Sequence, residues 1–260
     1  MYFHRLCEFS LPIPPLQEQQ KIAEILACCE KAIALKKQFI AEKRRQKASL
    51  MQKLLDPDSG VRLAGFEKSW KTYQICEVAQ VTSGGTPDTK CKAYWNGEIP
   101  WCTPSDISSA HKYLEWTQLR ITKTGMNQSS ATLLPAGSIL MCSRASIGPR
   151  AISKIPICTN QGFKNFICKP GLSNEFFYYY LETIVPSFLK KAGGNTFKEV
   201  SKTDVEKQLI SIPPKEEQVA IANILSTADR EIDLLEQELD AWQQKRKALM
   251  QLLLTGLVRV

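Results

Sequence analysis

The chain has 260 residues, of which 43% are hydrophobic, 23% charged and 8% aromatic. At roughly 150 residues per domain, this length gives one or two domains, and the composition excludes disordered, collagen-like and disulfide-dense secreted chains. The longest apolar candidate, the broken stretch 249–258, falls short of the roughly 18 residues that span a bilayer. The first ten residues include His4, Arg5 and Glu8 and lack the apolar core of a secretory signal. We therefore expect a cytoplasmic protein without a membrane contact.

The net charge of +8 is unevenly distributed along the chain. Residues 61–210 contain 18 basic and 11 acidic side chains, and the 59 residues from Trp116 to Asn174 contain no Asp or Glu at all. A solvated neutral surface mixes both signs, whereas a surface without carboxylates does not repel a phosphate backbone. The pattern favours a polyanion as the partner, with chance in a basic protein as the alternative. The cations of this run are Arg120, Lys123, Arg144, Arg150, Lys154, Lys164 and Lys169.

The sequence contains an internal repeat. Residues 13–26 read IPPLQEQQKIAEIL and residues 212–225 read IPPKEEQVAIANIL, and the same offset of 199 relates 50–52 to 249–251. Each copy begins with a Pro-Pro pair, which marks the start of a helix, and carries a glutamate in the first turn, where it interacts favourably with the helix dipole. The repeat predicts two helices of about 35 residues, each roughly 50 Å long.

Both copies carry apolar residues at alternating spacings of four and three, which predicts a heptad seam. A helix of this length needs a partner along its length, and the repeat supplies one. If the segment between the helices is a globule with its ends close together, the helices pair antiparallel, with Ile22 near Leu253 and Leu54 near Ile221. The alternative is two amphipathic helices packed separately on a larger core. The predicted seam residues are Ile22, Leu26, Ile33, Ile40, Leu50, Leu54, Ile221, Leu225, Ile232, Leu235, Leu239, Trp242, Leu249 and Leu253.

The central segment has a different period. After the linker 56–60, short apolar runs bounded by turn residues predict strands, among them 139–141 and 165–168. Asn174 is expected to cap a helix over 175–191, which has an apolar face and ends before Gly193-Gly194. We predict an α+β fold, with one mixed α/β globule and two long helices that form an antiparallel coiled coil.

Polar loops rich in glycine recur through this globule, at 81–87, 143–148, 159–164 and 193–198. Arg, Asn, Gln and Lys side chains match base edges in the major groove, and glycine permits a close approach of the backbone to phosphates. The aromatic residues Tyr94, Trp95 and Trp101 are expected to pack locally rather than to stack on bases. The loops therefore point to a nucleic-acid interface.

Enzymatic chemistry has less support in the sequence. Nine cysteines are scattered without a C-x-x-C pair, and the only histidines are His4 and His111, so we expect reduced thiols, no metal and no other cofactor. The chain has no G-x-x-x-x-G-K-[ST] loop, no glycine fingerprint for S-adenosylmethionine and no N-P-P-Y-type catalytic loop. Asp58 together with the Asp88-x-Lys90 motif leaves a metal-dependent nuclease as an alternative. The enzymatic rival is therefore an autonomous nuclease or methyltransferase.

Five motifs follow one another along the chain: I-P-P-x-x-E-Q at 13–19 and again at 212–218, S-G-G-T-P…Y-W-N-G-x-I-P-W at 83–101, S-R…I-G at 143–148, N-Q-G-F at 160–163 and N-T-F-K-x-V-S at 195–201. Together they resemble the DNA-specificity subunit of type I restriction–modification enzymes, over nearly the whole chain. The resemblance implies globular target recognition domains that each read one half of a split DNA site. It also implies long helices that act as a spacer and dock methyltransferase subunits.

One departure from the family is large. The family commonly has two recognition domains, in the order domain, helix, domain, helix, whereas residues 1–12 match only the tail of a first domain. We predict a domain remnant at 1–12, a first helix at 13–56, one target recognition domain at 61–210 and a second helix at 211–260. One chain is then expected to read one half-site, and a homodimer would supply the second recognition domain.

We predict a non-catalytic subunit that binds double-stranded DNA and positions methyltransferase subunits, and through them the restriction subunit. The rival of another class is a coiled-coil scaffold that binds only protein. Basic loop residues are expected to contact phosphates and polar loop residues to read bases. The predicted DNA-binding residues are Thr86, Lys90, Lys92, Ser143, Arg144, Arg150, Asn160, Gln161, Lys164, Asn195, Thr196, Lys198 and Lys202.

Overall fold

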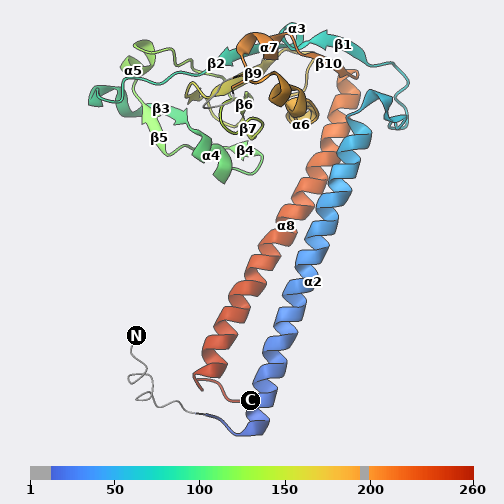
Figure 1. Cartoon of the computed structure of the whole chain (residues 1–260), viewed down its shortest axis with the longest axis vertical. Coiled ribbons are helices and arrows are strands. Elements are labelled where there is room, and N and C mark those ends of the chain that lie inside the picture. The colour runs from blue at the N-terminus through green and yellow to red at the C-terminus, as the bar shows by residue number, and fades with distance from the viewer. Residues whose placement is uncertain (1–12, 194–198) are drawn as a thin grey trace. The chain divides into compact units, whose positions relative to one another are not determined.

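A computed structural model describes residues 13–193 and 199–260 (Figure 1). The chain divides into two compact units. One comprises the chain up to Ser49 together with Ser226–Val260, and the other comprises Leu50–Leu225. Among the residues described, the first unit is a pair of helices, and the second contains all the strands. No helix among the residues described is long and apolar enough to cross a membrane.

Two long helices dominate the secondary structure, α2 (Leu16–Leu54) and α8 (Lys215–Leu254). Their 39 and 40 residues contain no proline or glycine, so no residue type that breaks helices interrupts either of them. Each starts after its Pro-Pro pair, with Glu18 in the first turn of α2 and Glu216 and Glu217 in that of α8. The helix starts predicted from the repeat are confirmed.

Within the helix unit, α2 and α8 run antiparallel side by side (Figure 1). Ion pairs join the two helices, with nitrogen–oxygen distances of 2.6 Å for Lys36–Glu238, Lys43–Glu231 and Arg246–Glu30. Residue numbers rise along one helix as those of the partners fall along the other, which is the antiparallel arrangement expected from the sequence. Lys36, Lys43 and Arg246 therefore each have a carboxylate partner on the other helix.

Most predicted seam residues are removed from solvent. Those of α2 that are buried are Ile22, Ile33, Ile40 and Leu54, and those of α8 are Ile221, Leu225, Ile232 and Leu253. Leu26, Leu235, Leu239, Trp242 and Leu249 are half-buried. The exception is Leu50, which is 36% exposed, and this prediction is wrong. The next residue, Met51, packs against the buried core instead. The seven-residue spacing from Lys47 to Leu54 fits a heptad through Leu50, with spacings of three and four, or through Met51, with spacings of four and three.

The globular unit contains three sheets. The largest has the strand order β2 (Ala79–Ser83), β9 (Phe163–Cys168), β6 (Ile139–Cys142), β7 (Arg150–Ser153) and β4 (Tyr113–Leu114), with only the β4–β7 pair parallel. The second comprises β5 (Leu119–Ile121), β3 (Trp95–Cys102) and β8 (Cys158–Thr159). The third pairs β1 (Lys71–Gln74) with β10 (Leu209–Ile212). The strands predicted around 139–141 and 165–168 are confirmed.

One long helix, α6 (Asn174–Lys191), packs in the largest hydrophobic core of the globular unit. Its apolar face includes Phe176, Phe177, Leu181 and Phe188, each 0% exposed. The N-cap is Ser173, whose hydroxyl accepts from the amide of Phe176, so the prediction of Asn174 as the cap is wrong by one residue. The shorter helices are α3 (Ile75–Val78), α4 (Pro104–Ser109), α5 (Lys123–Asn127) and α7 (Lys202–Glu206), with 3₁₀ turns η1 (Pro57–Ser59) and η2 (Lys92–Tyr94).

The ends of the globular unit meet in one core. β1 and β10 pair antiparallel, with Lys71 opposite Ile212 and Gln74 opposite Leu209, so the segment leaving α2 and the segment entering α8 lie together. Leu54, Leu55 and Leu225 share this core with α6 and the largest sheet. The close approach of the globule's ends, on which the antiparallel prediction depended, is therefore present.

Candidate nucleic-acid interface

Three loops of the globular unit form a loop cluster, consisting of residues 83–87, 143–148 and 159–162. The amide of Gly85 donates to the Thr159 carbonyl at 2.9 Å, and the amide of Ser143 donates to the Gly162 carbonyl at 2.8 Å. A Cβ on Gly84 would lie 2.0 Å from the Asn160 carbonyl oxygen, so this close approach requires glycine. Loops far apart in the sequence thus become one surface.

The loop cluster surrounds an open hollow of about 260 Å³. Arg144 and Gln161 are exposed beside it, Asn160 is half-buried, and the Asn160 side chain accepts from the Gly162 amide at 2.9 Å. The hydroxyl of Thr86 donates to the side-chain oxygen of Gln161. Four predicted DNA-binding residues therefore meet here; the hollow is lined by Pro104, Arg144, Ala145, Asn160, Gln161 and Gly162.

Three other predicted DNA-binding residues point into the protein. Ser143 is 0% exposed and its hydroxyl donates to the Gly162 carbonyl. Lys164 is 4% exposed and its ammonium donates to the Ser143 hydroxyl at 3.3 Å. The Arg150 side chain donates to the Tyr178 carbonyl and pairs with Glu182 at 2.6 Å. The internal contacts of these three side chains disfavour a direct DNA contact, because each already satisfies groups inside the domain.

The remaining predicted residues lie away from the hollow or outside the described chain. Lys90 and Lys92 are exposed in the segment that leads into β3. Lys202 is exposed at the start of α7, with its ammonium 3.5 Å from the Glu206 carboxylate. Asn195, Thr196 and Lys198 lie outside the residues that the structure describes.

Glu199 is the residue of this surface that the sequence analysis missed. Its backbone forms antiparallel bridges with Arg144 and Gly193, and the next amide, of Val200, donates to the Ser143 carbonyl at 3.1 Å. Its carboxylate lies 3.2 Å from the Lys164 ammonium and 4.0 Å from the Arg144 guanidinium. Glu199 occupies the variable position of the N-T-F-K-x-V-S motif, so a carboxylate at that position was the available signal.

Neighbouring segments bind several cations of the carboxylate-free run, and two of them, Arg150 and Lys164, pair with carboxylates. Besides Arg150 and Lys164, the Lys169 ammonium donates to the carbonyls of Cys76 and Glu77 at 3.0 and 2.9 Å. The Lys154 ammonium lies 3.8 Å from the ring centroid of Tyr113. A count of charges along the sequence therefore overestimates the cations available to a polyanion.

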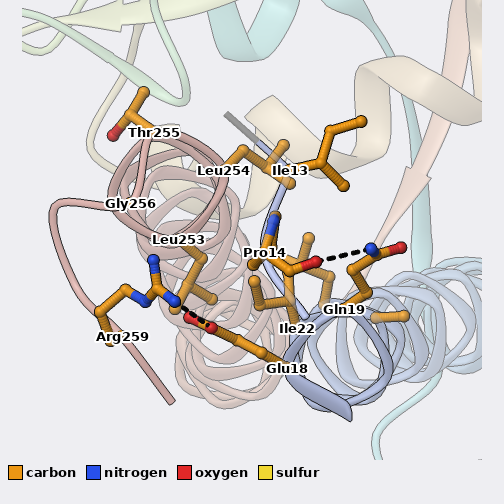
Figure 2. A pocket seen from close by; sticks show the side chains of 12 residues that line it. Ile13, Pro14, Glu18, Gln19, Ile22, Leu253, Leu254, Thr255, Gly256 and Arg259 are labelled. Carbon is orange, nitrogen blue, oxygen red and sulfur yellow. Dashed lines mark hydrogen bonds and ion pairs between the residues drawn. The ribbon is translucent and has the colours of Figure 1, made fainter. Parts of the chain in front are cut away.

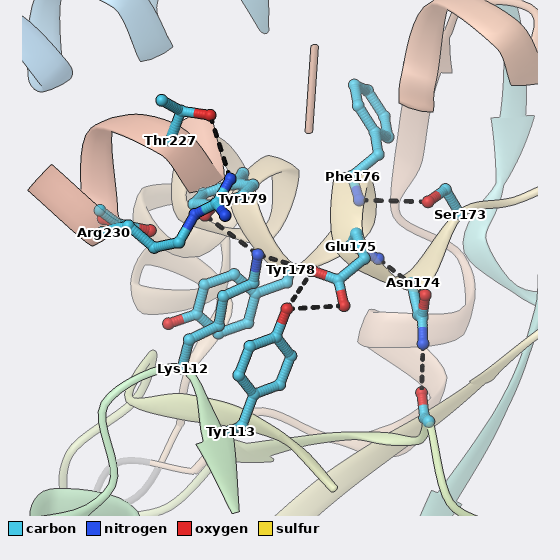
Figure 3. Close-up of polar contacts among 12 residues, drawn as sticks. Lys112, Tyr113, Ser173, Asn174, Glu175, Phe176, Tyr178, Tyr179, Thr227 and Arg230 are labelled. Carbon is cyan, nitrogen blue, oxygen red and sulfur yellow. Dashed lines mark hydrogen bonds and ion pairs between the residues drawn. The ribbon is translucent and has the colours of Figure 1, made fainter. Parts of the chain in front are cut away.

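A buried lysine outside the run is held in the same manner (Figure 3). The Lys112 ammonium lies 2.6 Å from the Glu175 carboxylate and donates to the Tyr179 hydroxyl at 3.0 Å. The hydroxyl of Tyr113 donates to the same carboxylate at 2.9 Å. Lys112 therefore serves packing between β4 and α6, and its charge does not reach the loop cluster.

The aromatic and sulfur groups behind the loops are structural. Trp95 and Trp101 pack edge to face with centroids 5.0 Å apart, and the Trp101 ring nitrogen donates to the Gly85 carbonyl, which confirms local packing. Burial raises the pKa of the Cys142 thiol to about 11 and that of the Cys158 thiol to about 11, so both are protonated at neutral pH. Among the residues described, no group of three or more His, Cys, Asp and Glu side chains lies close enough together to hold a metal ion.

The helix unit carries a pocket of about 740 Å³ at the end where α2 begins and α8 ends (Figure 2). The side-chain amide of Gln19 donates to the Pro14 carbonyl at 2.7 Å, as Gln218, its equivalent in the repeat, does to Pro213 at 2.9 Å. Gln218 is 1% exposed and also bonds to the backbone of Gly171 and Ser173, whereas Gln19 is exposed. The repeat is therefore structural as well as sequential, with one copy covered by protein and the other open.

The type I restriction modification DNA specificity domain is the family whose model matches the chain, over residues 1–42 and 67–242. The chain belongs to this family. Among curated relatives, a type I restriction enzyme MjaIX specificity subunit from Methanocaldococcus jannaschii is 41% identical over 65% of this chain and 39% of its own. A type I restriction enzyme EcoR124I/EcoR124II specificity subunit from Escherichia coli is 30% identical over 84% of this chain and 55% of its own.

Solved structures of specificity subunits have the same fold. An HsdS subunit from Thermoanaerobacter tengcongensis matches with a TM-score of 0.59 and 21% identity, over 95% of this chain and 60% of its own. A chain from a study of assembly of the type I R-M system matches with a TM-score of 0.63 and 21% identity, over 95% of this chain and 61% of its own. The chain thus spans about three fifths or less of the length of these specificity subunits.

Proposed function

We propose that the chain is a sequence-specific DNA-binding subunit of a type I restriction–modification system that reads one half-site through the loop cluster. The observation that carries this proposal is the meeting of Arg144, Asn160 and Gln161 around one open hollow. Guanidinium and amide groups are the side chains that pair with guanine and adenine edges in the major groove. Membership of the DNA specificity family supports the same conclusion.

The proposed mechanism separates positioning from reading. Exposed cations such as Lys90, Lys92 and Lys202 would contact phosphates and fix the domain on the duplex without reading sequence. Base edges would enter the hollow beside Arg144 and Gln161. The Thr86 hydroxyl would fix the side-chain amide of Gln161, so that less conformational entropy is lost on binding.

The test is fluorescence anisotropy with a labelled duplex selected from a random library by the full chain. Arg144→Ala and Gln161→Ala are each expected to weaken binding to the selected duplex by about 1–3 kcal/mol and to relax the sequence preference. Gln128→Ala is the matched control, because Gln128 is exposed at the end of α5 and does not line the hollow. If the chain shows no sequence preference, or if the control loses as much affinity, the loop cluster is not the reading surface.

The helix unit is the proposed docking surface for methyltransferase subunits, and through them for the restriction subunit. Leu35 and Phe39, one turn apart on α2, are 56% and 50% exposed, which gives the helix an apolar outer surface in addition to its buried seam. Co-purification with the methyltransferase subunit of the same system is expected to fail for Leu35→Glu with Phe39→Glu while DNA binding is retained. Co-purification without any DNA binding would support the rival, a scaffold that binds only protein.

We further propose that two chains associate to supply two recognition domains for a bipartite site. Apolar side chains at the open end of the helix unit support this, since Ile13 and Leu16 are 76% and 68% exposed and Leu257 is 76% exposed. Sedimentation velocity is expected to show a dimer that Ile13→Ser dissociates and that Leu234→Ser, at a 61% exposed position within α8, does not. A wild-type monomer at micromolar concentration would exclude the homodimer.

The subunit itself is proposed to be non-catalytic and to act in the cytoplasm, where its DNA target lies and where its cysteines stay reduced. Incubation of the purified chain with DNA, Mg²⁺ and S-adenosylmethionine is expected to give neither cleavage nor methylation. Turnover that disappears on Asp88→Asn would instead identify the chain as an enzyme.

A further inference from the structure

Glu199 is a carboxylate at the edge of a surface that the proposed function assigns to a polyanion. Its side chain is 40% exposed, and it reaches Lys164 on one side and Arg144 on the other. A carboxylate at this place repels phosphate, so it opposes non-specific attachment to DNA. Glu199 is therefore expected to lower the affinity of the surface for DNA of any sequence.

The two contacts of Glu199 differ in kind. Lys164 has a side chain only 5% exposed, and a buried ammonium needs a charged or polar partner, so the pair at 3.2 Å is tied to the interior. Arg144 has a side chain 45% exposed, and its guanidinium lies 4.0 Å from the Glu199 carboxylate, a longer distance than that of the Lys164 pair. The first contact anchors the carboxylate, and the second can be exchanged for another acceptor.

The backbone connects the same residues. Arg144 and Glu199 form an antiparallel bridge, and Ser143 receives the amide of Val200, which is fully buried. Lys164 donates to Ser143 as well. The 143–148 loop is therefore held at its first residues by Glu199 and the groups around it, while the Arg144 side chain extends from the point of attachment.

We propose that Glu199 is a specificity-determining, positioning residue that holds the Arg144 side chain by a weak ion pair. A base edge can take the place of Glu199 as the partner of Arg144. A phosphate can do so only at a cost in binding free energy. The inference rests on the proposed DNA binding by the loop cluster. Guanine O6 and N7 together offer two acceptors to a guanidinium, which compensates for the lost ion pair, whereas a phosphate brought to Arg144 also approaches the Glu199 carboxylate. Glu199 thus lowers non-specific affinity more than specific affinity.

The experiment measures binding of the full chain with Glu199→Gln to the selected duplex and to a scrambled duplex, between about 50 and 200 mM salt. We expect affinity for the scrambled duplex to rise about threefold to tenfold. We also expect its log–log salt slope to steepen by about 0.9, the value of one additional phosphate contact. The ratio of specific to non-specific affinity falls accordingly. Glu182→Gln is the matched control, because it removes the partner of Arg150 in the same domain, and it leaves the ratio unchanged.

A second variant separates positioning from folding. Glu199→Asp keeps the charge but shortens the reach to both Arg144 and Lys164, so non-specific affinity is expected to rise less than in Glu199→Gln, and the melting temperature reports any loss of the pair with Lys164. Adding Arg144→Ala to Glu199→Gln is expected to abolish the gain in non-specific affinity. This second expectation holds only if Arg144 makes the additional phosphate contact.

Equal weakening of both duplexes by Glu199→Gln would reduce Glu199 to a structural ion pair and overturn the inference. A gain that persists in the double variant would overturn it as well, because the additional contact would then not involve Arg144. Failure of the wild-type chain to prefer any duplex is a different result, since it refutes the proposed function and removes the basis of the inference with it.

Discussion

Ala145, in the lining of the hollow, has a left-handed backbone with φ of 63°. A side chain with a Cβ loses roughly 1–2 kcal/mol in this region, whereas glycine does not. We predict that Ala145→Gly raises the free energy of unfolding by about 0.5–1 kcal/mol, after the entropy that glycine adds to the unfolded chain is subtracted.

Denaturant titration checks the Ala145 prediction. Ala136→Gly is the control, because Ala136 is exposed in a turn and is not among the described residues with positive φ. The control is expected to lose about 0.5–1 kcal/mol. If both substitutions destabilise alike, the backbone at Ala145 is not strained.

The buried thiols give a pH dependence. Burial raises the pKa of the Cys142 and Cys158 thiols from 9.0 to about 11 and that of Cys168 to about 12. Between pH 9 and 11 the unfolded chain loses these protons while the folded chain keeps them, so unfolding becomes more favourable as the pH rises. We predict that the midpoint of urea unfolding is constant below about pH 8.5 and falls from about pH 9 to 11.

Alkylation tests the same thiols by another route. Iodoacetamide at pH 8 is expected to modify the exposed Cys28 and Cys76 first and the buried Cys102, Cys142 and Cys158 only after unfolding. Rapid modification of Cys142 in the native chain would contradict its burial, and mass spectrometry of peptides distinguishes the sites.

At the scale of single residues, the sequence indicated which loops carry polar groups but not which way each side chain points. Ser143 is buried whereas the next residue, Arg144, is exposed. Lys164 is buried whereas Gln161, three residues earlier, is exposed. No pattern within one loop fixes this direction, because the side chains contact groups from other segments, such as Gly162 for Ser143, Thr86 for Gln161 and Glu199 for Lys164. The sequence analysis assigned Thr86, Arg144, Asn160 and Gln161 to one interface. Their arrangement around the hollow could be seen only in the folded structure.

At the scale of elements, the helices were predictable for two reasons. The repeat defined both starts, and long heptad patterns without proline or glycine are a strong signal for a helix pair. The local spacing of three or four residues could not decide between Leu50 and Met51. Sheet order was not predictable either, since β4 lies parallel beside β7, a pairing that depends on tertiary contacts rather than on local sequence.

The position of the seam gives a matched pair of substitutions on α2. Leu54 is 6% exposed and belongs to the core, whereas Leu50 is 36% exposed. Leu54→Ala is expected to lower the free energy of unfolding by about 2–4 kcal/mol and Leu50→Ala by less than about 1 kcal/mol. Alanine has the highest helix propensity, so neither substitution weakens the helix itself and the difference reports burial. Denaturant titration measures both, and equal losses would restore Leu50 to the seam.

The repeat gives a second matched pair at the scale of elements. Gln218 makes buried hydrogen bonds to Gly171, Ser173 and Pro213, whereas its equivalent Gln19 is exposed and bonds to Pro14. Gln218→Ala leaves backbone groups unsatisfied and is expected to cost about 2–4 kcal/mol, and Gln19→Ala less than about 0.5 kcal/mol. Thermal unfolding distinguishes them. A large effect at Gln19 would mean that the open end of the helix unit is covered in solution.

At the scale of the whole molecule, the net charge of +8 overstates the attraction to DNA. Of the seven cations in the carboxylate-free run, Arg150 and Lys164 have side chains that are nearly buried and pair with carboxylates, and Arg144 lies 4.0 Å from the Glu199 carboxylate. Phosphate contacts therefore come from fewer groups than the sequence contains. Charge counted along a chain predicts the class of partner, and only the folded structure shows how many charges remain for it.

The salt dependence of DNA binding measures that remainder. If the seven cations of the run bound phosphates together with the proposed contacts Lys90, Lys92 and Lys202, the logarithm of the binding constant would fall with the logarithm of salt concentration with a slope of about −9. Two to four contacts instead give about −2 to −4. We predict the smaller slope for the wild-type chain on a scrambled duplex. Lys92→Ala is expected to reduce its magnitude by about 0.9 and Lys164→Met to leave it unchanged, because Lys164 is buried beside Glu199. A slope near −9 would mean that the internal ion pairs open on DNA, and Lys164→Met would then reduce its magnitude as much as Lys92→Ala does.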